Sequence, residues 1–305
     1  VTAAMVKELR EMTGAGMMDC KKALSNTDGD MDKAVEYLRE NGMAKAAKKA
    51  GRIAAEGIVK VVTEGSKAAI VEVNSETDFV AKNADFNAYV EEVAQQALNT
   101  KASDIDGFLA ESWNKDSSKT VADVLAGQIA VIGENLKIRR FAQIEENNGF
   151  IASYIHMGGK IGVLVDVETD VVNPAIEEMA KNVAMQAAAL KPMYTNRSEV
   201  DPEYIAKETE IITITAKNEK PDANDKIIEG MVKGRLNKEL KEICLLDQTY
   251  VKAEDGKQSV SAYVASVAKE NSANITIKGF VRFETGEGLE KKNEDFAAEV
   301  AAQLQ

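Results

Sequence analysis

The sequence predicts an α+β protein. A small three-helix module comes first, two related α+β subdomains form the core, and an antiparallel helical hairpin is inserted in the second subdomain. Three observations support this prediction: apolar residues recur at helical spacing near the N-terminus, β-rich segments follow, and one order of strand, loop and helix signals occurs twice. A chain of 305 residues with 45% hydrophobic residues can bury the two or three cores that this arrangement requires.

The N-terminal module is predicted to contain three short helices. Apolar residues recur at helical spacing in residues 5–12, and a Gly-Ala-Gly segment ends that pattern. A second helix is expected over residues 17–24. Asp30 is suited to cap a third helix, which we expect to end at Gly42 because glycine commonly follows the last helical turn.

A basic, alanine-rich stretch comes next. Its cations are Lys45, Lys48, Lys49 and Arg52. We interpret it as a solvated connecting segment that completes a unit of residues 1–52. The period of the pattern then changes to two, because residues 58–62 and 70–73 are β-rich and flank a Glu-Gly-Ser turn. A β-hairpin is expected there.

An internal repeat defines the core. Gly57 begins one strand pattern and Gly149 begins another. The triplet Glu-Thr-Asp follows at the same separation in both copies, at residues 76–78 and 168–170. Two related subdomains are therefore predicted, of which the first comprises residues 53–145.

The helix that follows each triplet supports the repeat. Asn83 and Asn173 are both suited to cap this helix, and Pro174 occupies the favoured first helical position in the second copy. The apolar stripes also correspond, with Phe86, Val90, Val93 and Ala97 in the first copy and Ile176, Ala180, Val183 and Ala187 in the second. Each stripe predicts a helix packed on a sheet.

The two copies differ in the loop before this helix. In the first copy residues 79–82 separate Asp78 from the cap, whereas in the second copy only residues 171–172 follow Asp170. The longer loop begins with Phe79. Because loops on a rigid scaffold commonly carry function, we expect the longer loop to make a specialised contact.

The region between the copies gives weaker signals. Residues 101–126 are polar and irregular in pattern, and they include Trp113 without a visible partner. Residues 129–141 are expected to return as a short strand toward the second copy.

The second subdomain is predicted to be interrupted. Residues 201–239 carry two helical patterns separated by a polar, proline-containing segment, which predicts an antiparallel helical hairpin. The strand-like residues 275–283 come only afterwards, so the second subdomain comprises residues 146–200 and 240–288. A C-terminal helical module is expected over residues 289–305. Its apolar face carries Phe296, Val300 and Leu304.

The composition argues against several classes of partner. A formal net charge of -12 and a pI of about 4.9 oppose non-specific attraction to phosphate backbones, so no direct nucleic-acid partner is expected. No apolar stretch approaches the roughly 20 residues that span a bilayer, so we expect a soluble, cytoplasmic protein with no membrane partner. Cys20 and Cys244 form no CxxC pair and are typical of reduced thiols, although the sequence alone also permits a disulfide.

Signatures of catalysis and cofactor binding are missing as well. His156 is the only histidine, so a histidine-rich metal site is impossible and a catalytic triad would depend on this one residue. There is no GxxxxGK[ST] phosphate loop, and the Gly-Ala-Gly of residues 14–16 follows a helix rather than a strand. Glu284, Glu287 and Glu290 lack the spacing of a cation site. We therefore expect no cofactor, no bound metal and no enzyme activity.

Several segments resemble a known family. Residues 13–24 (Thr-Gly-Ala-Gly-Met-Met-Asp-Cys-Lys-Lys-Ala-Leu) and residues 77–82 (Thr-Asp-Phe-Val-Ala-Lys) look like the two signature segments of the elongation factor Ts family. Supporting matches are Ile-Gly-Glu-Asn at residues 132–135, the cluster of Tyr154, His156 and residues 161–164, and residues 280–284 with Gly-Glu-Gly at 286–288. These matches span nearly the whole chain in order.

The resemblance implies a guanine-nucleotide exchange factor that binds the GDP-bound form of the GTPase elongation factor Tu during protein synthesis. It implies that Phe79 wedges between helices of the GTPase while Asp78 approaches the magnesium ion, with Thr77 and Val80 beside them. Disturbing the ion would remove positive charge from the diphosphate, and GDP would leave faster.

The resemblance also implies supporting contacts. They are Met17, Met18, Lys21, Ile132, Gly133 and His156. The N-terminal module resembles a ubiquitin-associated fold that docks on the nucleotide-binding domain of the GTPase, where its methionines would give adaptable apolar contacts. His156 would lie against another domain of the GTPase. Self-association through the helical hairpin is a further possibility.

Five of these residues have a plainer alternative role. Met17 and Met18 would be buried between the helices of their own module, and Phe79 would be an ordinary core aromatic residue. Asp78 would cap the turn that follows it, and His156 would be a hydrogen-bonded histidine in a hairpin.

Two alternative functions remain open at this point. The chain would be an adaptor whose helical module binds a ubiquitin-like or helical partner without any effect on nucleotide. It would otherwise be a carboxylate-dependent enzyme that relies on Glu284 or Glu287.

Overall fold

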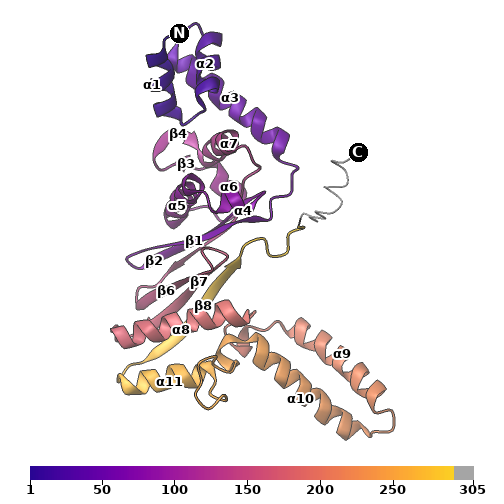
Figure 1. The fold of residues 1–305 in the computed structure, drawn as a ribbon. Coiled ribbons are helices and arrows are strands. Elements are labelled where there is room, and N and C mark those ends of the chain that lie inside the picture. The colour runs from indigo at the N-terminus through magenta and orange to yellow at the C-terminus, as the bar shows by residue number, and fades with distance from the viewer. Residues whose placement is uncertain (292–305) are drawn as a thin grey trace.

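The computed structural model of the chain describes residues 1–291. Figure 1 shows a helical module at one end, two sheets in the middle with helices on their outer sides, and a helical arm at the other end. The fold is α+β, as the sequence predicts. The predicted C-terminal helix, with Phe296, Val300 and Leu304, lies outside the described residues.

Three helices form the N-terminal module. They are α1 (Ala3–Thr13), α2 (Met17–Asn26) and α3 (Met31–Lys49). Their small core contains Leu9, Cys20, Ala23, Leu24 and Ala34. Asp30 caps α3 as predicted, because its side chain accepts a hydrogen bond from the backbone N–H of Lys33.

Two predictions about the end of this module are wrong. Helix α3 does not end at Gly42 but continues to Lys49, so most of the basic segment is helical. Gly42 is buried against α7 (Val121–Ile132), where an added Cβ would lie 3.7 Å from the carbonyl oxygen of Ala126. The glycine therefore lets two helices pack closely, and it does not end a helix.

Two antiparallel sheets form the core. The first has the order β1 (Glu56–Glu64), β2 (Lys67–Ser75), β5 (Lys137–Glu145), and the second has the order β6 (Gly149–His156), β7 (Ile161–Thr169), β8 (Ile275–Glu284). Helix α5 (Ala84–Asn99) packs on the first sheet and α8 (Pro174–Leu190) packs on the second. The predicted hairpin, the late strand β8 and both apolar stripes are confirmed, since every stripe residue is fully buried. Asn83 and Asn173 cap the two helices.

Two glycines show how the copies correspond in space. A Cβ on Gly57 would lie 2.1 Å from the carbonyl oxygen of Val73, and a Cβ on Gly149 would lie 1.9 Å from that of Val167. Each glycine thus lets the first strand of its sheet approach the backbone of the second strand. The repeat predicted from the sequence is present in the fold.

The alignment of the triplets needs a correction. Residues 65–66 join the first two strands of copy one, whereas residues 157–160 join those of copy two. The second strands are therefore shifted by two residues, and Ser75 corresponds to Thr169. Each of these hydroxyls donates a hydrogen bond to the carbonyl oxygen two residues further on, at 2.9 Å in both cases. The Glu-Thr-Asp triplets are not equivalent in space.

In the structure the two loops differ in length by more than the sequence alignment of the triplets indicates. Residues 76–82 connect Ser75 to the first helix cap, and residues 170–172 connect Thr169 to the second. The first loop is four residues longer, seven against three. Its extra length folds into the short helix α4 (Asp78–Ala81), which has no counterpart in the second copy.

The two sheets pack face to face. Their contact contains Val59, Ala68, Ile70, Leu164 and Phe283. The backbone N–H of Val59 donates a hydrogen bond to the carbonyl oxygen of Gly159 at 2.7 Å, and a Cβ on Gly162 would lie 2.5 Å from Cγ1 of Val59. This close approach fixes the turn between β6 and β7 beside β1.

A buried carboxylate crosses the same contact. Glu72 is fully buried and forms ion pairs with Arg139 at 3.2 Å and Arg140 at 2.5 Å. It also accepts a hydrogen bond at 2.8 Å from the backbone N–H of Gly286, which follows β8. The carboxylate of Glu72 thus has partners from the first sheet and from the segment that follows the second sheet, as a buried charge requires.

The region between the copies is more regular than the sequence predicts. It contains α6 (Ile105–Ala110), β3 (Ser112–Trp113), β4 (Asp116–Thr120) and α7. Trp113 does have a partner, because it is buried and stacks on Tyr89 with ring centroids 6.5 Å apart. Residues 129–132 belong to α7 and not to a strand, and a continuous apolar run of this length is ambiguous between the two.

The arm consists of the two predicted antiparallel helices, α9 (Pro202–Glu219) and α10 (Asp225–Ile243). Short helices η1 (Arg197–Glu199) and η2 (Leu245–Asp247) lie at its base. Helix α11 (Val260–Glu270), which the sequence did not reveal, packs beside α8. In Figure 1 the arm points away from the sheets.

A charged cluster surrounds Asp166 of β7, the central strand of the second sheet. The carboxylate of Glu146 is buried and forms an ion pair with Lys278 at 2.7 Å. The Oδ1 atom of Asp166 is buried and has no hydrogen-bond partner among the described residues. Burial, together with the neighbouring carboxylate of Glu146, raises the pKa of Asp166 to about 6.

We expect Gly57→Ala to lower the free energy of unfolding by more than about 2 kcal/mol, because the new Cβ would overlap backbone and φ of +122° is unfavourable for alanine. Gly230→Ala is the control: this glycine is exposed in α10, and apart from its chain neighbours and the nearby backbone of its own helix no described atom lies within 4 Å of an added Cβ. It should stabilise the protein by up to about 1 kcal/mol. Urea unfolding measures both, and equal stability of the two variants would contradict the proposed strand contact.

Asp166→Asn tests the charged cluster. A carboxyl group whose pKa rises on folding contributes stability at low pH and loses it as the pH rises through about 6. The variant should therefore exceed the wild type in unfolding free energy by about 1 kcal/mol at pH 7.5, after allowance for solvent screening, and the gap should close toward pH 4. Asp222→Asn, on the exposed turn of the arm, should show no such gap. A gap that is constant with pH would rule out this titration.

Candidate functional site

Helix α4 presents one aromatic ring to solvent. The hydroxyl of Thr77 caps the helix by accepting a hydrogen bond from the backbone N–H of Val80. Val80 is half-buried and Ala81 is buried, and both pack on the first core. Phe79 points away from that core and is 81% exposed. The prediction that this ring is exposed is confirmed, and the core-aromatic alternative is wrong.

Asp78 lies next to Phe79 at the first helical position. Thr77, and not Asp78, is the cap, so the capping alternative is wrong for this carboxylate. Asp78 forms an ion pair with Lys82 at 2.7 Å. The hydrogen bond from Lys82, supported by the charge of Lys160, lowers the pKa of Asp78 below its usual value. The carboxylate is therefore ionised at neutral pH.

A glutamate that the sequence analysis did not single out holds the start of α4. One oxygen of Glu134 accepts hydrogen bonds from the backbone N–H groups of Glu76 and Thr77, at 3.0 and 3.1 Å. The other oxygen accepts the hydroxyl of Thr77 at 2.6 Å. The sequence signal was available, because Glu134 lies in the Ile-Gly-Glu-Asn segment immediately after a helix-ending glycine.

The turn between β6 and β7 carries the second group of candidate residues. His156 is exposed at the end of β6, and its Nδ1 lies 2.8 Å from the hydroxyl of Tyr154. It is thus a hydrogen-bonded residue of a hairpin, and one ring nitrogen remains free of described partners. Met157, which the sequence analysis missed, is 71% exposed with a positive φ of 50°. A large apolar residue before two glycines was the available signal.

Helix α4 and this turn both lie beside β1 of the first sheet. Lys160 of the turn forms an ion pair with Glu56 of β1 at 2.8 Å, and its charge also acts on Asp78. The hydrogen bond between Val59 and Gly159 fixes the turn at the same place. The structure therefore brings the two candidate groups together from separate copies of the repeat.

The N-terminal module exposes the predicted methionines. Met17 is 59% exposed and Met18 is 73% exposed, so the alternative in which they are buried in the module is wrong. Lys21 is exposed on the same helix. Together these residues give α2 an apolar patch with a cation beside it.

The two remaining predicted residues lie at the end of α7. Ile132 is half-buried and packs on the first core, so little of its side chain is free for a partner. Gly133 is exposed and ends the helix in the left-handed conformation. The neighbouring Val131, which was not predicted, is 52% exposed.

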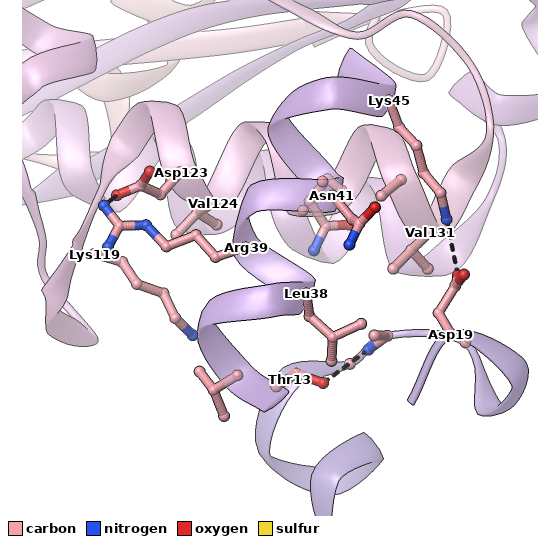
Figure 2. Close-up of a pocket in the computed structure, with 18 of the residues that line it drawn as sticks. Thr13, Asp19, Leu38, Arg39, Asn41, Lys45, Lys119, Asp123, Val124 and Val131 are labelled. Carbon is pink, nitrogen blue, oxygen red and sulfur yellow. Dashed lines mark hydrogen bonds and ion pairs between the residues drawn. The ribbon is translucent and has the colours of Figure 1, made fainter. Parts of the chain in front are cut away.

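A cleft of about 430 Å³ separates the N-terminal module from the core. It is lined by the loop of residues 14–16, by α3, and by α5, β4 and α7 of the first subdomain. Figure 2 shows two of the labelled cations beside acidic partners: Lys45 reaches Asp19 and Arg39 reaches Asp123, each at 2.9 Å. The ion pair of Arg39 with Asp123 connects the N-terminal module to the first subdomain. The cleft therefore lies at the interface of these two units.

A hydrogen bond at the far end of α3 closes the same interface. The ammonium group of Lys49 donates to the carbonyl oxygen of Gly133 at 2.7 Å. The orientation of the module is therefore fixed at two points along α3, at Arg39 and at Lys49. This places the methionine patch at a defined distance from the Phe79 turn.

The thiols of Cys20 and Cys244 are buried, and the carboxylates of Glu284 and Glu287 are paired. No group of three or more His, Cys, Asp or Glu side chains within residues 1–291 is arranged to hold a metal ion. Burial raises the pKa of both free thiols, Cys20 and Cys244. Glu284 and Glu287 are held in ion pairs, with Arg282 at 2.9 Å and Lys191 at 2.7 Å. In the part of the chain that the structure covers, no helix is long and apolar enough to cross a membrane.

Comparison with known proteins finds relatives along the whole chain. The family model described as "Elongation factor TS" matches residues 76–287. The chain is 55% identical over 306 residues to elongation factor Ts of Clostridioides difficile (strain 630), which covers 100% of this chain and 99% of the relative. It is 52% identical over 307 residues to elongation factor Ts of Clostridium botulinum (strain Eklund 17B / Type B), with 100% and 99% covered. For elongation factor Ts of Clostridium tetani (strain Massachusetts / E88) the identity is 51% over 308 residues, with 100% of both chains covered.

The packing of α3 on α7 can be tested at Gly42. Gly42→Leu should push the helices apart, because side-chain atoms beyond Cβ would enter the backbone of α7 at Ala126 and Gly127. We expect about 1–3 kcal/mol of destabilisation and faster amide exchange in α3. Gly42→Ala is the control, since its Cβ would make ordinary contacts at 3.7–3.9 Å. Leucine tolerated as well as alanine would show that the helices are not in close contact.

Proposed function

This chain belongs to the elongation factor Ts family, and we propose that it binds the GTPase elongation factor Tu in its GDP-bound form and accelerates the release of GDP. Membership of the family makes it a translation elongation factor. In the proposed mechanism the protein acts by contact and carries out no covalent chemistry, so it is an exchange factor and not an enzyme. Its place of action would be the cytoplasm, where translation occurs.

The observation that carries this proposal is the exposed ring of Phe79. A phenylalanine that is 81% exposed on an ordered turn leaves apolar surface in water, and burial of such a ring against a partner is worth about 1.5–3 kcal/mol. The ring projects from an element that the duplicated copy lacks. We propose that it inserts between helices of the GTPase and changes their spacing.

Asp78 would act beside the ring. The ionised carboxylate, next to Phe79, would be carried toward the magnesium ion of the partner as the ring inserts. Its ion pair with Lys82 is solvent-exposed and therefore weak enough to rearrange. A carboxylate near the ion would compete with the diphosphate for positive charge, and Lys82 would be left free to approach phosphate.

Thermodynamic reciprocity sets what such a contact can achieve. If the factor lowers the affinity of the GTPase for GDP, then GDP lowers the affinity of the GTPase for the factor by the same ratio. The corresponding coupling free energy is typically about 1–3 kcal/mol. The factor must therefore bind firmly through surfaces that do not depend on nucleotide. We propose that the methionine patch of α2 and the turn with His156 and Met157 supply this affinity on either side of Phe79.

The adaptor function remains the second candidate, because the exposed Met17 and Met18 form an apolar patch that would suit a ubiquitin-like or helical partner. An adaptor would bind without changing the rate of nucleotide release. The enzyme alternative has lost its support, since Glu284 and Glu287 are occupied by ion pairs.

Phe79→Ala should fold normally and slow the factor-stimulated release of GDP by about 30-fold or more, as expected if a buried anchor worth at least 2 kcal/mol is removed. Stopped-flow release of a fluorescent GDP analogue from elongation factor Tu measures this. Val172→Ala is the matched control, because Val172 is 53% exposed in the shorter loop of the second copy. Unchanged stimulation by the folded Phe79 variant would reject the role of the ring. No stimulation by the wild type would reject the proposed function.

A further inference from the structure

The turn that carries Phe79 cannot hold its own shape. Helix α4 has four residues, and a single helical turn is unstable in isolation because nucleation fixes several dihedral angles for one hydrogen bond. The ring of Phe79 adds no packing, since it is 81% exposed. Only Val80 and Ala81 anchor the helix to the core by apolar contact.

Glu134 satisfies the polar groups that this turn leaves open. Its carboxylate binds two backbone N–H groups and the Thr77 hydroxyl, as described above. That hydroxyl has two tasks, because it donates to Glu134 and accepts from the backbone N–H of Val80 at 3.3 Å. Removal of the carboxylate would leave the two N–H groups without their partner and free the hydroxyl to rotate out of its capping position.

The contact is reciprocal. Glu76 accepts a hydrogen bond from the backbone N–H of Asn135 at 2.7 Å, while Glu134 accepts from the backbone of Glu76. Asn135 is buried and donates to the carbonyl oxygen of Arg52 at 2.8 Å. The segment of residues 133–135 therefore joins the end of the N-terminal module to the start of α4.

The second copy of the repeat offers a comparison, because its loop is shorter and lacks the inserted helix. There the loop has no α4, and Asp170 is bound instead to Asn274, whose backbone N–H and side-chain amide both donate at 2.8 Å. The shorter loop is thereby tied to the start of β8 and presents no ring. The anchor at Glu134 thus accompanies the inserted helix.

We infer that Glu134 is a positioning residue for nucleotide exchange: its carboxylate holds the Thr77 turn so that Phe79 projects at the angle that the partner requires. This inference rests on the proposed function. Glu134 acts through Thr77 and α4 and need not touch the GTPase itself. Loss of the carboxylate would leave the Phe79 ring in place but without a fixed orientation.

The test compares variants of Glu134 in the full chain. Glu134→Ala should reduce the maximal rate of stimulated GDP release by roughly 10- to 100-fold, because a displacement of about 1 Å can cost that much. The factor concentration at half-maximal effect should change by less than about threefold, since the methionine patch is untouched. Glu134→Gln should lose less, because its amide oxygen can still accept. Glu64→Ala, at an exposed glutamate of β1, is the matched control and should behave as wild type.

A double variant separates positioning from general stability. In the Phe79→Ala background, Glu134→Ala should cause no further loss of rate, because there is no ring left to aim. An equal loss in both backgrounds, or a full rate for folded Glu134→Ala, would overturn the inference. If Glu134→Ala does not fold, the same comparison with Glu134→Gln decides.

Amide exchange gives a readout that does not depend on the GTPase. Glu134→Ala should speed hydrogen exchange at the Ala81 and Lys82 amides, which are bonded within the turn to Thr77 and Asp78, and should leave α5 protected. Unchanged protection would overturn the inference. If the wild type fails to stimulate GDP release, the proposed function fails, and this measurement still decides whether Glu134 holds the turn.

Discussion

The face-to-face contact of the two sheets is the constraint on which the arrangement of this molecule depends. A glycine at position 162 lets Val59 approach β7, and the hydrogen bond from Val59 to Gly159 ties the turn of the second sheet to a strand of the first. Because neither sheet can slide without breaking these contacts, α4 and the turn with His156 keep one relative position. Two exposed groups from distant parts of the sequence then act as a single surface.

Duplication followed by local divergence explains how that surface arose from a symmetrical core. Both copies keep the strand glycine, the capped helix and the buried apolar stripe, so the framework is the same twice. Only the first copy inserts four residues before its helix, and these form α4 with its exposed ring. A stiff scaffold tolerates such an insertion, because the loop lies at the surface and its polar groups find partners in Glu134 and Thr77.

The N-terminal module is held to this framework along α3. Gly42 allows α3 to pack closely on α7, and the contacts of Arg39 and Lys49 with the core fix the direction of the helix. A continuous helix transmits position over its length, whereas the solvated connecting segment predicted from the sequence would not. The methionine patch and the Phe79 turn therefore keep a fixed relative position. This arrangement suits a partner that is bound through one surface while its conformation is changed at another.

The sequence by itself determined the local elements, because caps, apolar stripes and turns are set by the side chains of neighbouring residues. The caps at Asp30, Asn83 and Asn173, the stripes of the two core helices, the first hairpin and the order of the repeat were predicted correctly, whereas the alignment of the Glu-Thr-Asp triplets was not. It also indicated that the loop with Phe79 differs between the copies. Only the tertiary structure decided that α3 continues past Gly42, that Trp113 stacks on Tyr89, and that Glu134 holds the start of α4. These features depend on groups that are far apart in the chain, and periodicity carries no information about which distant backbone will lie beside a glycine or a carboxylate.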